Sequence, residues 1–600
     1  MKISPTSVGA GGVALLLAGA ALFPALGQEH PESLLPPGFD SPAPSPTPRP
    51  SQTGPAQLLP PTGSNPPASV AGAPAVAPLP SSDEALGNET AAELPPVDLS
   101  KYELPDSAKR SLAAVGPSSP ASGGLAQNAL GHADGRYLET LMRRLDAPIA
   151  SRWMSIALRR MLLSKLDTPA QVNGADFAAE RAWLLLRMGE SVAARYLVQS
   201  VDIDNYTPKM FQVAMQASLA TADPAGLCPL VERGSALDPA RGWTLAQAMC
   251  AGLAGDPNAA GQQIDAARHQ GVAGGVDLLL AEKIAGMGAE GRRAVTIEWA
   301  GVDRLTTWRF GLASASGADI PEPLYGTLRP QVRYWRALLP GPDPVTRASA
   351  AELAAAQGVF SSSALVDLYG EIADTGDNSA EAGTARDLRS AFADSDAQDR
   401  LTAMRGLWNG ANGARARYGR LILTARAATG IPAEAAYSSD ADALVASMLS
   451  AGLEQPAERW SAVAPRGSDA WAMLALASRS PTLVRYGDAD SYRGRADAHK
   501  AQMLIAGLAG LGRLSLDDAR GLARAARFDL DTQNPWTWAI DAAAQRHETG
   551  SVVLLAAVGM QTPVWQGVPP EMLYHICRDL RAVGLDGYAR MIAAEAIARL

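Results

Sequence analysis

The middle of the chain has a 33-residue period. Small residues mark one register, at Gly189, Ala222, Gly255 and Gly288. Branched aliphatic residues keep the same interval nine positions later, at Val198, Val231, Ile264 and Ile297. A third register precedes the small residues by seven positions, at Ala182, Met215, Ala248 and Ala281. Registers in step at this period are typical of stacked helical hairpins, which build binding surfaces and imply no reaction.

Each repeat unit predicts two helices, A and B, joined by a turn at the small residue. Four dipeptides pair an N-cap residue with proline at the predicted helix starts: Thr207-Pro208 and Asp238-Pro239 for helix A, and Asp223-Pro224 and Asp256-Pro257 for helix B. Proline is favoured there because its missing N–H would have had no helical partner. We expect the branched residue to lie on the buried face of helix B.

Residues 174–303 resemble tetratricopeptide repeats. The 33-residue unit compares with about 34 in that family, and an alanine follows the turn by five positions at Ala194 and Ala260. Trp183 and Tyr196 supply the aromatic residues of the first unit. The resemblance implies an α-solenoid with a concave surface that binds proteins.

Beyond the strict repeats, nearly every segment from about Asp134 onward predicts helix, because alanine, leucine and arginine are abundant and alternating runs are few. The fold class predicted is therefore all-α, an α-solenoid of stacked helical hairpins. We expect a helical repeat array over 125–311, a proline-rich joint over 312–345, and a second array with a C-terminal cap over 346–600.

Positions 1–27 have the pattern of a secretory signal peptide. Lys2 precedes an apolar run from Val13 to Leu26, and small residues at Ala25 and Gly27 mark a cleavage site. The run of about 14 residues is shorter than the roughly 20 that span a bilayer, so we expect cleavage before Gln28. The alternative is an uncleaved anchor; no membrane span is expected after signal removal.

Residues 28–124 are rich in proline, serine and alanine, and predict a disordered tether, because they offer too little apolar surface to offset the entropy of folding. Leu34, Leu35 and Phe39 form an apolar island in this tether and are candidates for a partner-binding motif. The alternative is that the island packs back on the repeats or stays solvated.

The net charge of −9 argues against nucleic acid as a partner, since phosphate binding needs a surplus of basic residues. Basic residues are mostly arginine, and alanine and glycine are abundant, which suggests a bacterial source of high GC content. Together with the signal peptide, this composition predicts a periplasmic or secreted protein.

Three cysteines are too few for a disulfide framework in a chain of 600 residues. Cys228 and Cys250 fall on consecutive helices of neighbouring repeats, and we expect them to pair if the helices are suitably staggered. Cys577 would then be free or buried.

Motifs for chemistry are scarce. The G-x-G-x-x-G pattern at Gly286 lacks the strand and the βαβ unit that dinucleotide binding requires. His575 and Asp579 share a helix face and are expected to pair, whereas Cys577 points elsewhere. We predict no catalytic residues, no cofactor and no metal site.

Arginine beside tryptophan recurs at Trp308, Arg309, Trp335 and Arg336. Both residue types are favoured anchors in binding sites, so these four are candidates for a partner-binding groove. The alternative is core packing between hairpins.

These patterns favour a non-enzymatic periplasmic scaffold or adaptor that binds a protein partner of a cell-envelope assembly. The alternative is a cell-wall (peptidoglycan) active enzyme or accessory subunit, because the helical part is also similar to the superhelical part of lytic transglycosylases. The catalytic pattern of those enzymes has no counterpart in this sequence.

Overall fold

The computed structural model describes residues 105–146, 148–288, 295–480 and 482–600. By its contacts, the part of the chain from Arg110 to Leu600 forms one compact unit. The predicted signal peptide and the island at Leu34, Leu35 and Phe39 lie outside the described residues. The predicted boundaries within 125–600 remain predictions.

The described part of the chain is helical, apart from two strands of two residues each. The helices up to the expected joint are α2 (Gly135–Arg144), α3 (Arg152–Leu163), α4 (Gly174–Arg187), α5 (Ser191–Val198), α6 (Pro208–Ala220), α7 (Val231–Leu237), α8 (Arg241–Leu253), α9 (Pro257–His269), α10 (Gly275–Met287), α11 (Thr307–Ser316), α12 (Glu322–Tyr325) and α13 (Gln331–Leu338).

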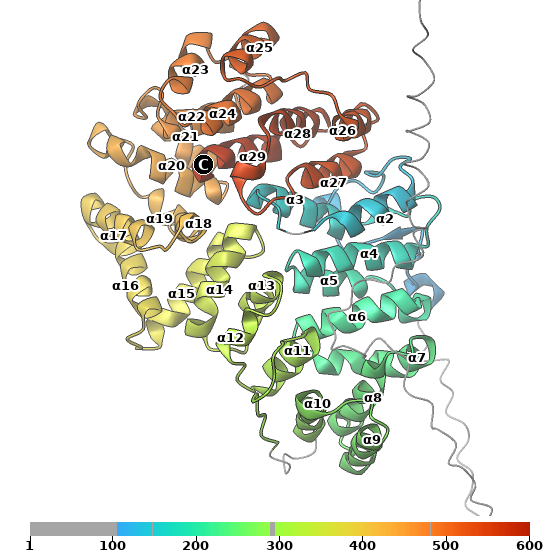
Figure 1. Cartoon of the computed structure of the whole chain (residues 1–600). Coiled ribbons are helices and arrows are strands. Elements are labelled where there is room, and N and C mark those ends of the chain that lie inside the picture. Colours follow the sequence, from blue (N-terminus) through green and yellow to red (C-terminus); the bar gives the residue numbers. More distant parts are fainter. Residues whose placement is uncertain (1–104, 147, 289–294, 481) are drawn as a thin grey trace, which may run out of the picture. The chain divides into compact units, whose positions relative to one another are not determined.

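The helices that follow are α14 (Pro344–Gln357), α15 (Ser362–Asp374), α16 (Ala380–Ala393), α17 (Ala397–Asn409), α18 (Ala414–Leu423), α19 (Ala425–Ala428), α20 (Ala441–Ser450), α21 (Glu454–Glu458), α22 (Asp469–Ala477), α23 (Tyr486–Arg493), α24 (Ala498–Gly510), α25 (Leu516–Ala525), α26 (Pro535–Gln545), α27 (Thr549–Gly559), α28 (Pro570–Ala582) and α29 (Asp586–Arg599). They pack in a helical-repeat-like arrangement (Figure 1). None of the helices in the described ranges has the length and hydrophobicity needed to span a bilayer.

Seven 3-10 helices and one strand pair complete the described elements. The 3-10 helices are η3 (Asp106–Ala108), η4 (Pro120–Ser122), η5 (Ile203–Asn205), η6 (Pro224–Leu230), η7 (Ala435–Asp440), η8 (Arg459–Ala462) and η9 (Trp565–Gly567). Strand β1 (Ala114–Val115) pairs antiparallel with β2 (Leu166–Asp167).

The last part of the expected tether is folded. Residues 110–124 contain β1 and η4, and Val115 is buried. The Arg110 side chain forms an ion pair with Asp202, near η5. The sequence pattern missed this order because the segment is held by partners far away along the chain, not by its own periodicity.

The turns of the repeat lie where the 33-residue interval places them. Gly189, Ala222 and Gly255 each follow a helix A in the left-handed conformation, with φ of 88°, 51° and 89°. Gly288 differs, with φ of −83°.

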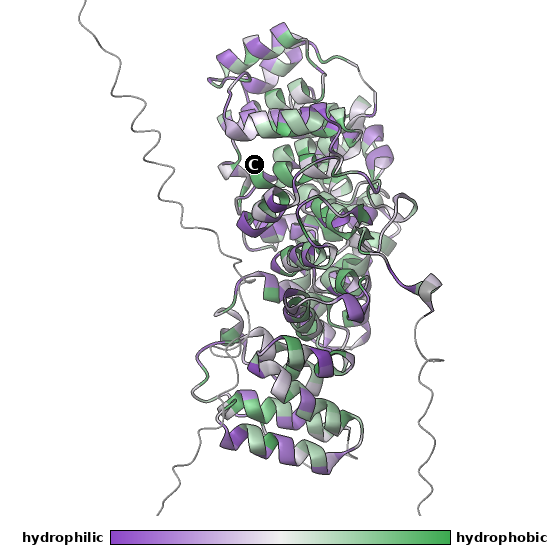
Figure 2. Ribbon diagram, turned by 90° about the vertical axis from the view of Figure 1, so that its right-hand side faces the viewer, coloured by the Kyte–Doolittle hydropathy of each residue, from purple (hydrophilic) through white to green (hydrophobic). Residues whose placement is uncertain are grey.

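The branched aliphatic residues of helix B also lie where the 33-residue interval predicts them. Val198, Val231 and Ile264 are buried, as expected for the inner face of helix B. Hydrophobic and hydrophilic residues share most helices in Figure 2, as in helices that bury one face.

Three of the four expected N-caps close a helix start with a side-chain hydrogen bond. Thr207 accepts from the backbone N–H of Met210, Asp223 from that of Gly226, and Asp256 from that of Ala259. Asp238 is the exception, because α8 begins only at Arg241 and the Asp238 carboxylate instead accepts from the indole of Trp243 at 2.9 Å.

The fourth repeat unit departs from the pattern. The described residues from 295 to 306 contain no helix, so the helix B expected around Ile297 does not appear there. Helix α11 instead packs against both α6 and α10 (Figure 1). A Cβ at Gly311 would lie 2.5 Å from the backbone oxygen of Leu219, so only glycine permits this approach of α11 to α6.

Helices from the two ends of the described array are in contact. Helix α3 contacts α4 and α5 as well as α14, α27 and α29, which follow much later in the chain (Figure 1). The Glu595 carboxylate accepts hydrogen bonds from the backbone N–H groups of Arg152 and Trp153, at 2.8 and 3.2 Å, and from the Ser151 hydroxyl at 2.5 Å. Arg599 adds a charged donor at 2.8 Å.

The Arg152 side chain continues this buried network. Its guanidinium donates to the backbone oxygens of Ala355, Phe360 and Ser450, which lie near the C-terminal ends of α14 and α20. Burial lowers the pKa of Arg152, with partial compensation from Glu595. Arg152 therefore joins the start of α3 to the ends of α14 and α20. We define the Arg152–Glu595 network as Ser151, Arg152, Trp153, Glu595 and Arg599.

Replacing Gly255 by alanine should lower the free energy of unfolding by about 1 kcal/mol, because the left-handed conformation strains any residue with a Cβ. The matched control is Gly261→Ala inside α9, where a Cβ meets nothing within 4 Å. That change should stabilise the protein by roughly 0.5–1 kcal/mol. Urea titration followed by circular dichroism measures both; the same sign at both positions would contradict the assigned turn.

Replacing Glu595 by glutamine should lower the free energy of unfolding by roughly 3–5 kcal/mol, the usual loss when one member of a buried ion pair is removed. The control, Glu571→Gln, removes a carboxylate from the first turn of α28 and should cost less than about 1 kcal/mol. The same urea titration compares the two variants. Equal losses would show that the Arg152–Glu595 network carries no special share of the stability.

Candidate functional site

A cavity of about 460 Å³ lies among helices α17, α18, α20, α22, α24 and α29. The cationic side chains on its lining are Arg405, Arg417, Lys500 and Arg599. The acidic side chains are Asp440, Asp442 and Asp469, and apolar residues such as Leu421, Met473 and Ile597 lie between the charges. We call this space the charged cavity.

Each carboxylate of the charged cavity already accepts hydrogen bonds from the protein. Asp440 accepts from Arg405 at 2.7 and 2.6 Å, and these bonds lower the pKa of Asp440. Asp469 accepts from Lys500 at 2.7 Å and from the Tyr492 hydroxyl at 2.8 Å.

Asp442 accepts from the backbone N–H of Ala470 at 2.6 Å, and burial raises the pKa of Asp442. The three carboxylates thus serve internal contacts.

The arginines of the charged cavity retain free donors. Arg599 uses one nitrogen on the backbone oxygen of Ala150 and on Glu595, while its guanidinium lies 4.7 Å from the centre of the Tyr418 ring. Arg417 is exposed and forms no ion pair or hydrogen bond through its side chain within the described part of the chain. The site is therefore suited to recognising acceptor groups.

Sequence reasoning identified none of the residues that line the charged cavity. They come from helices spread between Arg405 and Leu600 and follow no common spacing. No local sequence motif marks such a site, because the lining residues come together only when distant helices pack.

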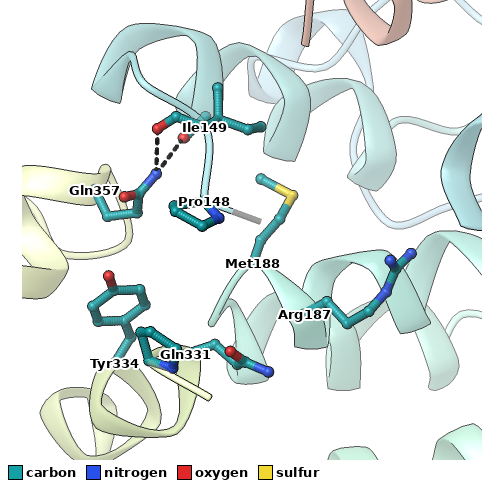
Figure 3. Close-up of a pocket in the computed structure, with 9 residues that line it drawn as sticks. Pro148, Ile149, Arg187, Met188, Gln331, Tyr334 and Gln357 are labelled. Carbon is teal, nitrogen blue, oxygen red and sulfur yellow. Dashed lines mark hydrogen bonds between the residues drawn. The ribbon is translucent and has the colours of Figure 1, made fainter. Parts of the chain in front are cut away.

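A second pocket lies where α13 and α14 meet the loop before α3 (Figure 3). The Gln357 amide donates to the backbone oxygen of Ile149 at 2.9 Å and contacts the Ser155 hydroxyl at 3.1 Å. Arg415 donates to the Gln357 carbonyl at 2.6 Å and to the Tyr334 hydroxyl at 2.7 Å. With about 20 Å³, this pocket has room for a single water molecule and for no larger ligand.

His575 pairs with a residue of another helix. Its Nδ1 lies 2.8 Å from a carboxylate oxygen of Asp541 in α26, instead of pairing with Asp579 one turn further along α28. The expected partner, Asp579, accepts from Arg578 at 2.8 Å. Proximity along one helix suggested Asp579, whereas the packing of α26 against α28 supplies Asp541.

Asp541, His575 and Asp579 place one ligand atom each within 4.8 Å of one another, a spacing compatible with a metal ion. The guanidinium of Arg578 contacts both carboxylates and supplies the positive charge that a metal would bring. Burial lowers the pKa of His575 and raises the pKa of Asp579 to about 6. We interpret the group as a structural ion cluster.

Cys228 and Cys250 form a disulfide that links η6 to α8, with Cα atoms 5.4 Å apart. Both residues are partly exposed. Cys577 is a buried thiol, and burial raises its pKa. A reactive cysteine needs a stabilised thiolate, so Cys577 is unsuited to nucleophilic chemistry.

Trp308 and Trp335 are fully buried. The Trp308 indole donates to the backbone oxygen of Asp277 at 3.2 Å, and the Trp335 ring centre lies 5.9 Å from that of Phe310. Both indoles are therefore part of the core and do not form a binding surface. Trp308 lies against α10 and Trp335 against Phe310 of α11, which the neighbouring arginines in the sequence did not reveal.

The neighbouring arginines hold internal contacts. Arg309 donates to both carboxylate oxygens of Asp277, at 2.8 and 2.7 Å. Arg336 forms an ion pair with Glu322 at 2.8 Å and stacks 4.6 Å from the centre of the Tyr325 ring. The four residues do not line one groove.

Comparison with models of known protein families, with curated proteins and with solved structures finds no match to this chain.

Thiol counting tests the cysteine assignments. Native protein should not react with a thiol reagent, since Cys577 is buried and the other two cysteines are bonded. Unfolding without reductant should expose one thiol, and unfolding with reductant should expose three. Three thiols without reductant would contradict the disulfide.

Proposed function

We propose that this protein is an exported, non-enzymatic scaffold whose helical repeats bind a partner protein of the bacterial cell envelope. The observation that carries the proposal is the charged cavity. It offers fixed donors beside apolar side chains on a helical-repeat framework, whereas its carboxylates are occupied by internal contacts.

The solenoid interpretation supports this proposal. Stacked hairpins with left-handed turns at Gly189 and Gly255 expose helix surfaces over many repeats. Such surfaces bind proteins through extended sets of side chains. The tetratricopeptide-like interval in 174–303 points to the same class of role.

Two observations support export. Positions 1–27 have the pattern of a signal peptide, and Cys228 with Cys250 forms a disulfide. Disulfides persist in the periplasm and outside the cell, while cytosolic reductants keep thiols reduced. Both observations therefore support the proposal that the protein is exported to the periplasm or outside the cell.

In-cell photo-cross-linking tests the function. A photoreactive amino acid is placed at exposed positions on several helices, Tyr196 in α5, Phe392 in α16 and Trp538 in α26, and at Asn409 on the rim of the charged cavity. We expect a discrete protein adduct, identified by mass spectrometry, from one helix surface and not from all of them.

Two outcomes would contradict the proposal. One is the absence of any protein adduct at every position. The other is release of soluble fragments from isolated cell wall by the purified protein, which would favour an enzyme acting on peptidoglycan.

A further inference from the structure

We propose that the charged cavity binds an acidic side chain of the partner polypeptide, with Arg417 and Arg599 as its donors. This inference rests on the proposed function and names the chemistry of the segment that is bound.

The hydrogen-bond donors and acceptors of the lining determine which charge a ligand should carry. Asp440 and Asp469 each form an ion pair with a cation of the lining, and Asp442 accepts a backbone N–H. Arg417 makes no side-chain hydrogen bond in the described ranges, and Arg599 bonds through one of its guanidinium nitrogens, so a ligand with acceptor groups can use the nitrogens that remain. A carboxylate is the acceptor that a guanidinium fork fits best.

Arg599 is held in place before any ligand arrives. The Tyr418 ring supports one face of its guanidinium, and Glu595 with the backbone oxygen of Ala150 fixes one end. A donor that is already ordered loses little entropy on binding. Because Glu595 also binds the start of α3, the Arg152–Glu595 network positions this donor.

Arg417 complements this fixed group from another helix. It precedes Tyr418 in α18, is exposed, and has no counterion within the described ranges. Its side chain can therefore bind a carboxylate that is already bound by Arg599.

The pairing of charges singles out one cation of the lining. Arg405 pairs with Asp440, Lys500 with Asp469 and Arg599 with Glu595. Arg417 is left without a carboxylate partner in the described part of the chain, and an acidic side chain would supply that partner.

The lining favours a polypeptide as the source of the carboxylate. Leu421, Met473 and Ile597 contribute apolar surface beside the charges. A glutamate or aspartate flanked by aliphatic side chains uses both features, as in other acidic motifs that bind arginine clusters.

Fluorescence anisotropy with the full chain tests the inference. The probe is a fluorescein-labelled peptide of alternating glutamate and leucine, compared with analogues in which glutamine or lysine replaces glutamate. We expect the glutamate peptide to bind about ten-fold more tightly than the glutamine peptide at low salt, a charge-assisted advantage that salt should reduce.

Arg417→Gln should weaken binding of the glutamate peptide about five-fold, and Arg417→Glu should invert the preference toward the lysine peptide. Both changes lie at an exposed position, so we expect the fold to be retained. The matched control is Arg524→Gln, an exposed helical arginine in α25 outside the cavity lining, which should leave the dissociation constant unchanged.

Equal affinity for the glutamate and glutamine peptides would overturn the inference. So would an unchanged dissociation constant in Arg417→Gln, or no binding tighter than about 1 mM, the weak limit of specific recognition. A partner that cross-links at Tyr196, Phe392 or Trp538 but not at Asn409 would leave the scaffold function standing and remove only this site.

Discussion

The carboxylate of Glu595 joins the beginning of the helical array to its end. It accepts from the first N–H groups of α3, which have no partner within their own helix, and Ser151 and Glu595 are 444 positions apart in the chain. Negative charge at a helix N-terminus is also favoured by the helix dipole. Since Arg152 then bonds the carbonyls that end α14 and α20, the order of several helices depends on one buried network. The same network holds Arg599 at the edge of the charged cavity. It therefore stabilises the fold and also positions a residue of the candidate site.

The 33-residue interval accounts for part of the architecture only. It places the turns and the buried face of helix B through three units, because both are local properties of a hairpin. It does not fix how hairpins stack. Helix α11 packs against both α6 and α10, and Gly311 permits its close approach to α6. A repeat in sequence therefore predicts the hairpin, whereas the order of packing depends on contacts outside the repeat.

Features set by residues close in the sequence could be predicted, whereas contacts between distant helices could not. The N-caps at Thr207 and Asp256 follow from a cap residue directly before proline, and the pairing of Cys228 with Cys250 follows from helix spacing. The pairing of His575 with Asp541 and the burial of Trp308 depend on neighbouring helices, which no spacing encodes. The charged cavity is the extreme case, since its arginines look like ordinary surface residues until α18 and α29 are placed together.

Amide hydrogen exchange at Arg152 and Trp153 tests the central claim most directly. In an isolated helix the first N–H groups exchange rapidly, because they have no acceptor. If Glu595 caps α3, these two amides should exchange as slowly as the buried amides in the middle of α3, and only through unfolding of the array. Rapid exchange at both amides in the intact protein would show that the two ends of the array are not joined as described.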